Sequence, residues 1–417
     1  MIKNKYLKHQ ASIHNLIWRG LQVLGKQGVI FAILILAAKL LDPYTFGVYN
    51  YILAIILFLV MFGDFGISTA TSKYVAEYNA TDKNKLKSVL FSSGIIILGL
   101  TIIITILTLT FGKYFLGDKY IYVLFSLPLI FLMPLSSLYD GIYRGLKKFK
   151  QLATISLGVG FLSLFFIYFL IKNYGLIGAL ISQNLFYLIL VIALGLGYRE
   201  FNFKLNKGVL KQIFSYSIIV GFAAISFFLY SKADVLILGH YGFINEIGYY
   251  ELIMQVFTFG FLPFVLLAQV IAPNITEYFA KKEFGKVILK WKKFLFFIIP
   301  LSIIIACLFY FLFPQALKLF LPKYYVPEMT ISIFILTFLI PAKIWGVFQT
   351  QGFIVSTGFA KINAITTFIG GVLNVILDVV FLKLMGFIGV FLVTLVIHSL
   401  TIIVQTIIFK RQMNRLK

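Results

Sequence analysis

Charged residues are scarce in this chain. Only 12% of its 417 residues are Asp, Glu, Lys or Arg, whereas soluble domains average about 25%. Residues 88–112 and 294–317 contain no charged residue at all, and each run exceeds the roughly 20 apolar residues that cross a bilayer as a helix. This scarcity excludes a soluble globular protein. The sequence predicts an all-α polytopic membrane protein.

Cysteine and histidine are also rare. The single cysteine, Cys307, lies in an apolar run, so disulfides play no part in holding the chain together. The four histidines are too scattered to bind a metal, and no Ser-His-Asp or Cys-His grouping has a supporting context. These absences argue against a hydrolase, and we expect a protein that is not an enzyme.

Acidic residues are few, 14 against 37 Lys and Arg, which gives a net charge of +23. Basic loops fix the topology of membrane proteins, and this explains the charge better than a nucleic-acid partner does. Residues 20–27 (GLQVLGKQ) match most of a phosphate-binding P-loop, but Gln27 stands where that loop needs Ser or Thr, and no strand precedes it. We therefore expect no nucleic-acid binding, no nucleotide hydrolysis and no cofactor.

Apolar runs divide the chain into twelve predicted spans. They cover residues 17–41, 46–72, 88–112, 120–143, 151–172, 176–198, 212–239, 247–273, 293–314, 327–351, 362–383 and 387–409. With a cytoplasmic N-terminus, 27 Lys and Arg fall on cytoplasmic segments and 6 on the opposite loops. This asymmetry predicts that both termini face the cytoplasm, in a protein of the inner (cytoplasmic) membrane. The polar, basic first 16 residues argue against a cleaved signal peptide.

The two halves of the chain resemble each other. Residues 131–145 (FLMPLSSLYDGIYRG) match 338–352 (FLIPAKIWGVFQTQG), 174–178 match 385–389, and 46–51 match 247–252. Six spans in each half give the halves one orientation, and parallel repeats of this kind place substrate at their interface. We predict an N-terminal six-helix lobe over residues 1–205 and a C-terminal six-helix lobe over residues 206–417.

Ionisable residues inside the predicted spans are the strongest functional candidates. Each costs about 2.5–3.5 kcal/mol at mid-helix, and such residues usually face a protein interior or a water-filled cavity. The cations, which we interpret as a site for an anionic headgroup such as phosphate, are Arg19, Lys26, Lys39, Lys232 and Lys343. The acids, which either pair with cations or bind a coupling proton or Na⁺, are Asp64, Asp234, Glu251 and Asp378.

Some of these residues have a simpler interpretation. Arg19, Lys39 and Glu251 lie near span ends, where side chains can reach the membrane surface. For His398 we expect a hydrogen bond between helices.

Lys232 and Asp234 lie two residues apart in the predicted helix 212–239. On a continuous helix their side chains point about 200° apart, so they cannot form a simple local ion pair. We predict that Lys232 faces a central cavity. Asp234 is expected to face a neighbouring helix of its own half, where a partner neutralises it.

Several ordered segments resemble one known family. AAKLLDPYTFGVYNY (37–51), GDFGISTATSKYVAEY (63–78) and SKADVLILGHYGFINEIGYYEL (231–252) are similar to segments of Wzx-type polysaccharide repeat-unit flippases. These flippases belong to the superfamily (MOP) that also contains multidrug (MATE) transporters. The chain departs from the pattern at Lys39, where Arg is usual, at Asp42, where Gly is usual, and at Val235, which replaces an Arg. Lys232 is the candidate to supply that last cation.

The resemblance implies a V-shaped pair of six-helix lobes that alternate between inward and outward openings. The implied cargo is a polyprenyl-pyrophosphate-linked oligosaccharide, moved from the cytoplasmic to the outer leaflet for an O-antigen, capsule or related polymer. The implied partners are membrane lipids, a polysaccharide polymerase and glycosyltransferases.

Four alternatives remain open. A multidrug antiporter of the same architecture should favour acids over cations in its spans. A lipid II flippase often carries two further helices, and a membrane-embedded glycosyltransferase would need long outer loops. A non-transporting scaffold or scramblase is the fourth.

Overall fold

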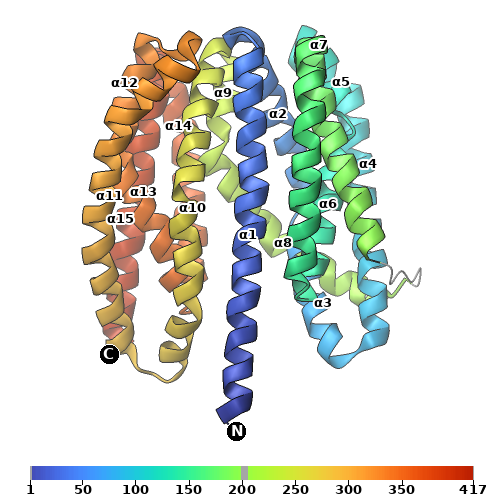
Figure 1. Ribbon diagram of the computed structural model, residues 1–417, viewed down its shortest axis with the longest axis vertical. Helices are drawn as coiled ribbons and strands as arrows, with labels where there is room; N and C mark the ends of the chain where they lie inside the picture. The colour runs from blue at the N-terminus through green and yellow to red at the C-terminus, as the bar shows by residue number, and fades with distance from the viewer. Residues whose placement is uncertain (1, 199–204, 417) are drawn as a thin grey trace. The chain divides into compact units, whose positions relative to one another are not determined.

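The computed structural model describes residues 2–198 and 205–416, except for the side chains of residues 2–17, 19, 24 and 26. Every regular element in the described chain is a helix. The helices are α1 (Ile2–Leu40), α2 (Pro43–Asp64), α3 (Ile67–Thr81), α4 (Lys83–Leu116), η1 (Gly117–Lys119), α5 (Tyr120–Ser126), α6 (Leu129–Gly145), α7 (Phe149–Gly197), α8 (Lys207–Ser231), α9 (Ala233–His240), α10 (Ile244–Ala280), α11 (Phe284–Phe320), η2 (Pro322–Tyr324), α12 (Pro327–Thr337), α13 (Leu339–Gln349), η3 (Thr350–Ile354), α14 (Ala360–Met385) and α15 (Phe387–Leu416) (Figure 1). The predicted all-α membrane fold is confirmed.

Nine helices of the described chain are long and apolar enough to cross a membrane, or up to ten if the pair bent by 50° at Phe338 is one span. α7 holds two of the predicted spans, because Gly175 (φ 54°, ψ −127°) interrupts its helical backbone. Beyond this kink, Gly178 packs directly on the carbonyl of Leu170, so the two arms of α7 fold back on each other. α6 has only 17 residues. The count of twelve spans therefore stays a prediction.

Four spans that were predicted as continuous are broken, and one of them, 327–351, is the pair α12 and α13 that bends at Phe338. The span 46–72 is interrupted at Phe65 and Gly66, whose positive φ angles of 37° and 79° end α2 before α3 begins. The span 120–143 divides into α5, which ends at Ser126, and α6, which begins at Leu129. Pro128 lies between them and has no amide hydrogen to continue a helix. The span 212–239 ends as α8 at Ser231 and resumes as α9, with Lys232 (φ −141°, ψ −12°) between them.

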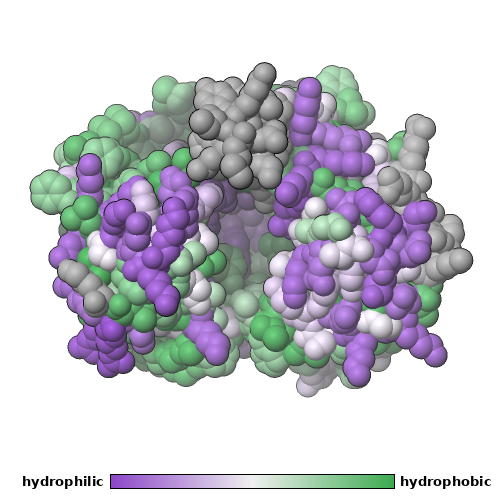
Figure 2. Space-filling view, turned by 90° about the horizontal axis from the view of Figure 1, so that it is seen from below, coloured by the Kyte–Doolittle hydropathy of each residue, from purple (hydrophilic) through white to green (hydrophobic). Residues whose placement is uncertain are grey.

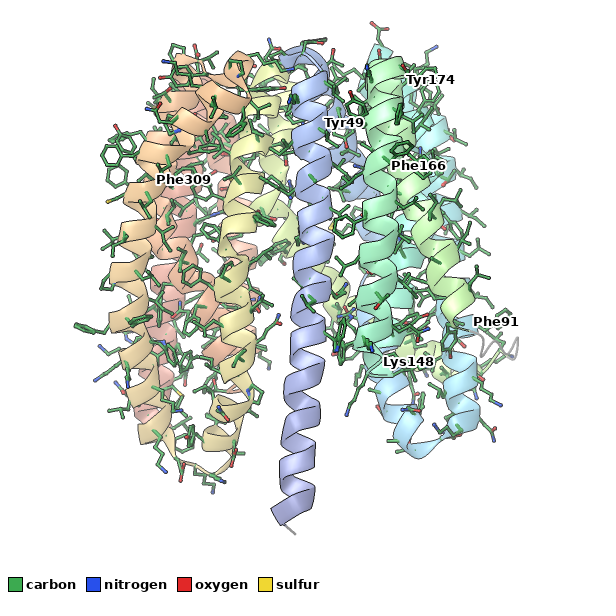
Figure 3. All side chains as sticks on the ribbon, viewed as in Figure 1. Tyr49, Phe91, Lys148, Phe166, Tyr174 and Phe309 are labelled. Carbon is green, nitrogen blue, oxygen red and sulfur yellow. The ribbon has the colours of Figure 1, made fainter. Side chains whose placement is uncertain are left out.

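The surfaces of the helices suit a bilayer. Large apolar side chains are exposed along them: Tyr174 of α7 is 65% exposed and Phe296 of α11 is 84% exposed. Figure 3 shows Tyr174 beside the bend of α7 at Gly175 and Phe166 farther along the first arm of that helix. Hydrophilic side chains instead gather at the end of each unit where the α3–α4 and α10–α11 loops lie, which Figure 2 shows end-on.

The chain forms two compact units. The first comprises Met1–Leu41 and Val48–Ile225, and the second comprises Asp42–Gly47 and Ser226–Lys417. The first unit ends at Ile225 and the second resumes at Ser226, both within α8. The lobe boundary at residue 205 stays a prediction.

The short segment Asp42–Gly47 belongs to the second unit through a close backbone contact. A Cβ atom on Gly47 would lie 1.8 Å from the carbonyl oxygen of Ile244, and one on Gly248 would lie 3.3 Å from that of Pro43. Gly47 and Gly248 occupy matching positions of the sequence repeat. The start of α2 and the start of α10 therefore cross through a matched pair of glycines.

Candidate functional site

The second unit buries the carboxylate of Asp234 in the first turn of α9. This residue is only 1% exposed. The hydroxyl of Tyr250 on α10 donates a hydrogen bond to Asp234 Oδ2, and Nδ2 of Asn374 on α14 donates one to Oδ1 at 2.7 Å. The hydroxyl of Thr394 on α15 lies 3.5 Å from Oδ2. All of these neighbours are neutral, so no cation among them balances the charge of Asp234.

A second buried carboxylate lies beside the first. Asp378 follows Asn374 by one turn of α14, and the same Asn374 amide donates to Asp378 Oδ2 at 2.8 Å. Both residues are fully buried. Among the described residues, Asp378 Oδ1 and Asn374 Oδ1 have no hydrogen-bond partner. Leaving a buried acceptor without a hydrogen bond is costly. This acid pair (Asp234 and Asp378) therefore has acceptor oxygens that no described donor or cation satisfies.

Lys232 finds a different acid. Its ammonium lies 2.6 and 2.8 Å from the two carboxylate oxygens of Glu251 on α10. The Glu251 side chain is 8% exposed and that of Lys232 is 32% exposed. The sequence predicted that Lys232 and Asp234 do not pair with each other, and they do not. The helix that was predicted to carry both residues is broken at Lys232. The headgroup-binding role of Lys232 stays a prediction. In this structure its ammonium forms an ion pair with Glu251.

Lys343 on α13 contacts a histidine rather than an acid. Its Nζ lies 2.6 Å from Nδ1 of His398 on α15. Nε2 of His398 lies 2.8 Å from the carbonyl oxygen of Tyr230. Because a carbonyl only accepts hydrogen bonds, Nε2 must carry the proton, and the lone pair of Nδ1 accepts from the Lys343 ammonium.

The break at Lys232 explains why this carbonyl is available. In a continuous helix the carbonyl of Tyr230 would accept from the amide of residue 234. Since α8 ends at Ser231, His398 satisfies it instead. The Tyr230 ring also stacks on the His398 ring, with centroids 4.0 Å apart, and lies 5.0 Å from the Lys343 ammonium. The hydrogen bond between helices that we expected for His398 is present.

Helix α15 contacts both the acid pair and the Lys343–His398 pair. Thr394 and His398 lie one turn apart on α15, with Thr394 facing Asp234 and His398 facing Lys343. The acid pair and the Lys343–His398 pair are therefore neighbours within the second unit.

The remaining predicted site residues lie elsewhere. Asp64, at the end of α2 in the first unit, accepts hydrogen bonds from the hydroxyl and the amide of Ser68. It thereby places a negative charge at the start of α3, where the helix dipole favours one. Lys39 is exposed near the end of α1. The side chains of Arg19 and Lys26 lie outside the described residues.

Three residues that contact the acid pair were not identified from the sequence. Tyr250, Asn374 and Thr394 are neutral, and only ionisable residues were selected as candidates. Asn374 did carry a signal, because it is a polar amide in the otherwise apolar stretch GGVLNVIL and lies four residues before Asp378. That spacing places both side chains on one face of a helix.

Comparison with known proteins identifies relatives over most of the chain. A family model described as polysaccharide biosynthesis protein matches residues 12–279. An uncharacterized membrane protein of Methanocaldococcus jannaschii is 27% identical over 406 residues, which cover 89% of this chain and 92% of that protein.

Three solved structures share the fold. An inward-facing multidrug resistance MATE family transporter of the MOP superfamily has a TM-score of 0.78 at 14% identity, with 95% of each chain covered. The lipid II flippase MurJ in an inward closed conformation has a TM-score of 0.74 at 17% identity, over 97% of this chain and 87% of MurJ. A MOP superfamily transporter from Pyrococcus furiosus, described as having a binding pocket of reverse polarity, has a TM-score of 0.68 at 15% identity, over 97% and 96% of the two chains.

Proposed function

Because this chain belongs to the family of polysaccharide biosynthesis proteins and has the fold of MOP superfamily transporters, we propose that it flips a lipid-linked glycan. The cargo is a polyprenyl-pyrophosphate-linked oligosaccharide, carried from the cytoplasmic to the outer leaflet by alternating access. The protein resides in the cytoplasmic membrane with both termini inside. It works with the glycosyltransferases that build the oligosaccharide and the polymerase that consumes it.

The observation that carries this proposal is the unbalanced charge of Lys343. Among the described residues, no carboxylate lies within 4.0 Å of its ammonium, and its hydrogen-bond partner His398 is a neutral acceptor. A cation inside a membrane span normally pairs with an anion or marks a substrate path. A pyrophosphate supplies the missing negative charge. Lys232 joins it when Glu251 releases the ammonium, and Arg19, Lys26 and Lys39 are the further proposed contacts of the headgroup.

The acid pair is the proposed site of a coupling cation. Two ionised carboxylates bridged by one amide repel each other strongly in a buried, low-dielectric setting. A proton on one of them, or a Na⁺ held between them, removes that repulsion. Asp378 Oδ1 and Asn374 Oδ1 have no other partner among the described residues, and carboxylate and amide oxygens suit a hard cation. Asp64 and Glu251, which the sequence grouped with these acids, have hydrogen-bonded partners of their own.

The connection through α15 links ion and cargo. A cation that draws Asp234, Asp378 and Thr394 together changes the position of α15, and His398 lies one turn farther along the same helix. The Lys343 ammonium follows its histidine partner. Cation occupancy and headgroup binding are thereby coupled within one unit.

Transport in reconstituted vesicles tests the proposal. The purified protein is placed in liposomes with a fluorescent polyprenyl-pyrophosphate oligosaccharide, and access of an external glycan-cleaving enzyme reports flipping. We expect Lys343→Ala to raise the half-saturating cargo concentration about tenfold, the equivalent of one lost charged contact. Lys343→Arg should retain most of the affinity. Equal transport by the wild type and Lys343→Ala would contradict the role of this cation.

A second candidate function rests on the same acid pair. Asp234 and Asp378 are also suited to an organic cation, as a multidrug antiporter would require. Ethidium efflux from cells distinguishes the two functions. Efflux that depends on Asp378 but not on Lys343 would favour the antiporter. A third candidate, a lipid II flippase, is distinguished by supplying lipid II as the vesicle cargo.

A further inference from the structure

A basic cavity lies at the end of the first unit that the sequence predicts to be cytoplasmic, far in sequence from the site above. It has a volume of about 540 Å³ and lies where α6 passes into α7. Three lysines line it, Lys147, Lys148 and Lys150, together with Gln151 and the half-buried Ile155. Figure 3 shows Lys148 at this end of the unit. The cavity therefore combines concentrated positive charge with an apolar wall.

The three lysines have no acidic partner in the part of the chain that the structure describes. Among the described residues, no carboxylate lies within 4.0 Å of their ammonium groups, and the nearby Asp140 is paired with Arg144 at 2.8 Å. Lysines near two other loops behave differently. Lys85, Lys281 and Lys286 each pair with an acid three or four residues away in the chain, at 3.6, 2.6 and 2.9 Å. No acid in the described part of the chain thus balances the charge at the α6–α7 loop.

The surroundings hold these ammonium groups in place. Lys148 lies 6.0 Å from the centroid of the Tyr198 ring, and Lys150 lies 5.5 Å from the Trp18 ring on α1. Gln151 donates a hydrogen bond to the carbonyl of Gly197 at 3.1 Å, which ties the start of α7 to its end. Aromatic rings at the membrane–water boundary and lysines beside them are typical of a headgroup region.

We propose that Lys147, Lys148 and Lys150 bind the phosphate of an anionic lipid in the cytoplasmic leaflet. Clusters of basic residues just cytoplasmic of membrane helices bind anionic lipids, each lysine adding to the attraction. The half-buried Phe149 and Ile155 offer apolar contact to the part of the lipid nearest its headgroup. Both a bilayer phospholipid and the pyrophosphate of a polyprenyl cargo carry this chemistry. The site does not depend on the proposed function, since either source would occupy it.

Native mass spectrometry of the full-length protein tests this site. The protein is released from micelles that contain equal amounts of phosphatidylglycerol and the zwitterionic phosphatidylcholine. The test variant is Lys147→Gln, Lys148→Gln and Lys150→Gln, and the matched control is Lys281→Gln, Lys282→Gln and Lys286→Gln. Both remove three lysine charges from a loop that the sequence predicts to be cytoplasmic.

We expect the test variant to bind phosphatidylglycerol at least tenfold more weakly, since each surface lysine contributes roughly fivefold. The control variant should bind like the wild type. An equal loss in both variants would show diffuse attraction to the whole basic end and overturn the proposal, as would no loss in either. Equal binding of the two lipids by the wild type would overturn it as well.

A pair of single substitutions separates charge from folding. Lys147 and Lys282 both adopt a left-handed backbone with φ 58°, and Gly358, two residues before α14 as Lys147 is two before α7, adopts φ 79°. Lys147→Gly and Lys282→Gly therefore relieve the same backbone strain. We expect both to leave the melting temperature unchanged or higher, while only Lys147→Gly weakens phosphatidylglycerol binding. Equal lipid binding by the two variants would contradict the site.

Competition identifies the source of the phosphate. Polyprenyl pyrophosphate is added to the wild type loaded with phosphatidylglycerol, with inorganic pyrophosphate as the control for the headgroup alone. Displacement by the polyprenyl lipid supports a docking site for cargo before transport. Retention of phosphatidylglycerol supports a site for a bilayer lipid.

Discussion

Asp234 and Asp378 lie on different helices, and a single side-chain amide bridges their carboxylates. Nδ2 of Asn374 is 2.7 Å from the first and 2.8 Å from the second. The two acids are 144 residues apart in the chain, yet both are buried in the same unit. This bridge joins α9 to α14. We therefore expect their relative position to depend on the proton or cation that balances the two negative charges.

Asp378→Asn removes one of these charges with little change in shape. We expect transport to lose its dependence on the coupling ion, because the neutral amide no longer needs a cation. The variant should be at least as stable as the wild type, since replacing a buried charged group by a neutral one of similar size is often neutral or stabilising. The measurement is vesicle transport with and without an imposed Na⁺ or proton gradient. A gradient dependence equal to that of the wild type would rule out this site.

His398 positions Lys343 and satisfies the Tyr230 carbonyl. We expect His398→Leu to destabilise the protein by about 1–3 kcal/mol, the cost of leaving a buried carbonyl unpaired, and to weaken cargo binding as Lys343→Ala does. His398→Gln keeps one donor and one acceptor and should restore part of both. Thermal unfolding in detergent and the half-saturating cargo concentration are the two readouts. Stability that falls without any change in cargo affinity would limit His398 to a structural role.

The Lys232–Glu251 pair holds the break between α8 and α9 against α10. Glu251→Ala leaves the Lys232 ammonium without its partner, and breaking such a pair costs about 3–5 kcal/mol when it is buried. Because Lys232 is about one-third exposed, we expect a smaller loss, about 1–3 kcal/mol. Adding Lys232→Met to Glu251→Ala should recover stability, which a double-mutant cycle measures. Additive losses in the cycle would show that the pair contributes nothing.

The crossing of Gly47 over Ile244 leaves no space for a side chain. Gly47→Ala places a methyl group 1.8 Å from a backbone oxygen, which cannot move aside as a side chain can. Overpacking of this kind typically costs about 1–3 kcal/mol. Gly99→Ala on α4 is the control, because nothing lies within 4 Å of its added Cβ, and helix propensity favours Ala. Equal melting temperatures for the two variants would contradict the close contact.

Asp42 caps the start of α2 and should make stability depend weakly on pH. Its carboxylate accepts a hydrogen bond from the amide of Thr45 at 3.1 Å, and the hydrogen bonds of Thr45 hold the pKa of Asp42 below its ordinary value. The stabilisation is therefore complete above the ordinary value of 3.8 and is lost as the pH falls through the lower pKa of the folded state.

Asp42→Asn can still cap the helix but does not titrate. We expect a cost of a few tenths of a kcal/mol at pH 7, since the carboxylate is well solvated. The difference from the wild type should shrink below about pH 4. Melting temperatures in detergent between pH 3 and pH 7 measure it, and a difference that grows on acidification would contradict the assignment.

Much of the fold followed from the sequence because the bilayer imposes it. Charge-free runs such as residues 88–112 have no other stable environment, and the spacing of those runs predicted the helices. The break at Lys232 was not predictable, because apolar residues continue on both sides of it. It depends on tertiary partners, above all Glu251 and His398.

The candidate site was predicted only in part. Asp234 and Asp378 stood out as acids in apolar spans, but nothing local indicates that they meet. Their bridge, Asn374, lies 140 residues from Asp234, and a contact at that separation is set by how α9 and α14 pack. The pairing of Lys343 with His398 rather than an acid likewise depends on the packing of α13 on α15.

Mass spectrometry of cellular lipids tests directly whether this protein moves a lipid-linked glycan. Polyprenyl-pyrophosphate lipids are extracted from cells with and without the gene, and from cells that carry Lys343→Ala. We predict that one lipid-linked oligosaccharide accumulates in the deletion and, to a lesser degree, in the variant. An unchanged lipid pool in the deletion would contradict the claim.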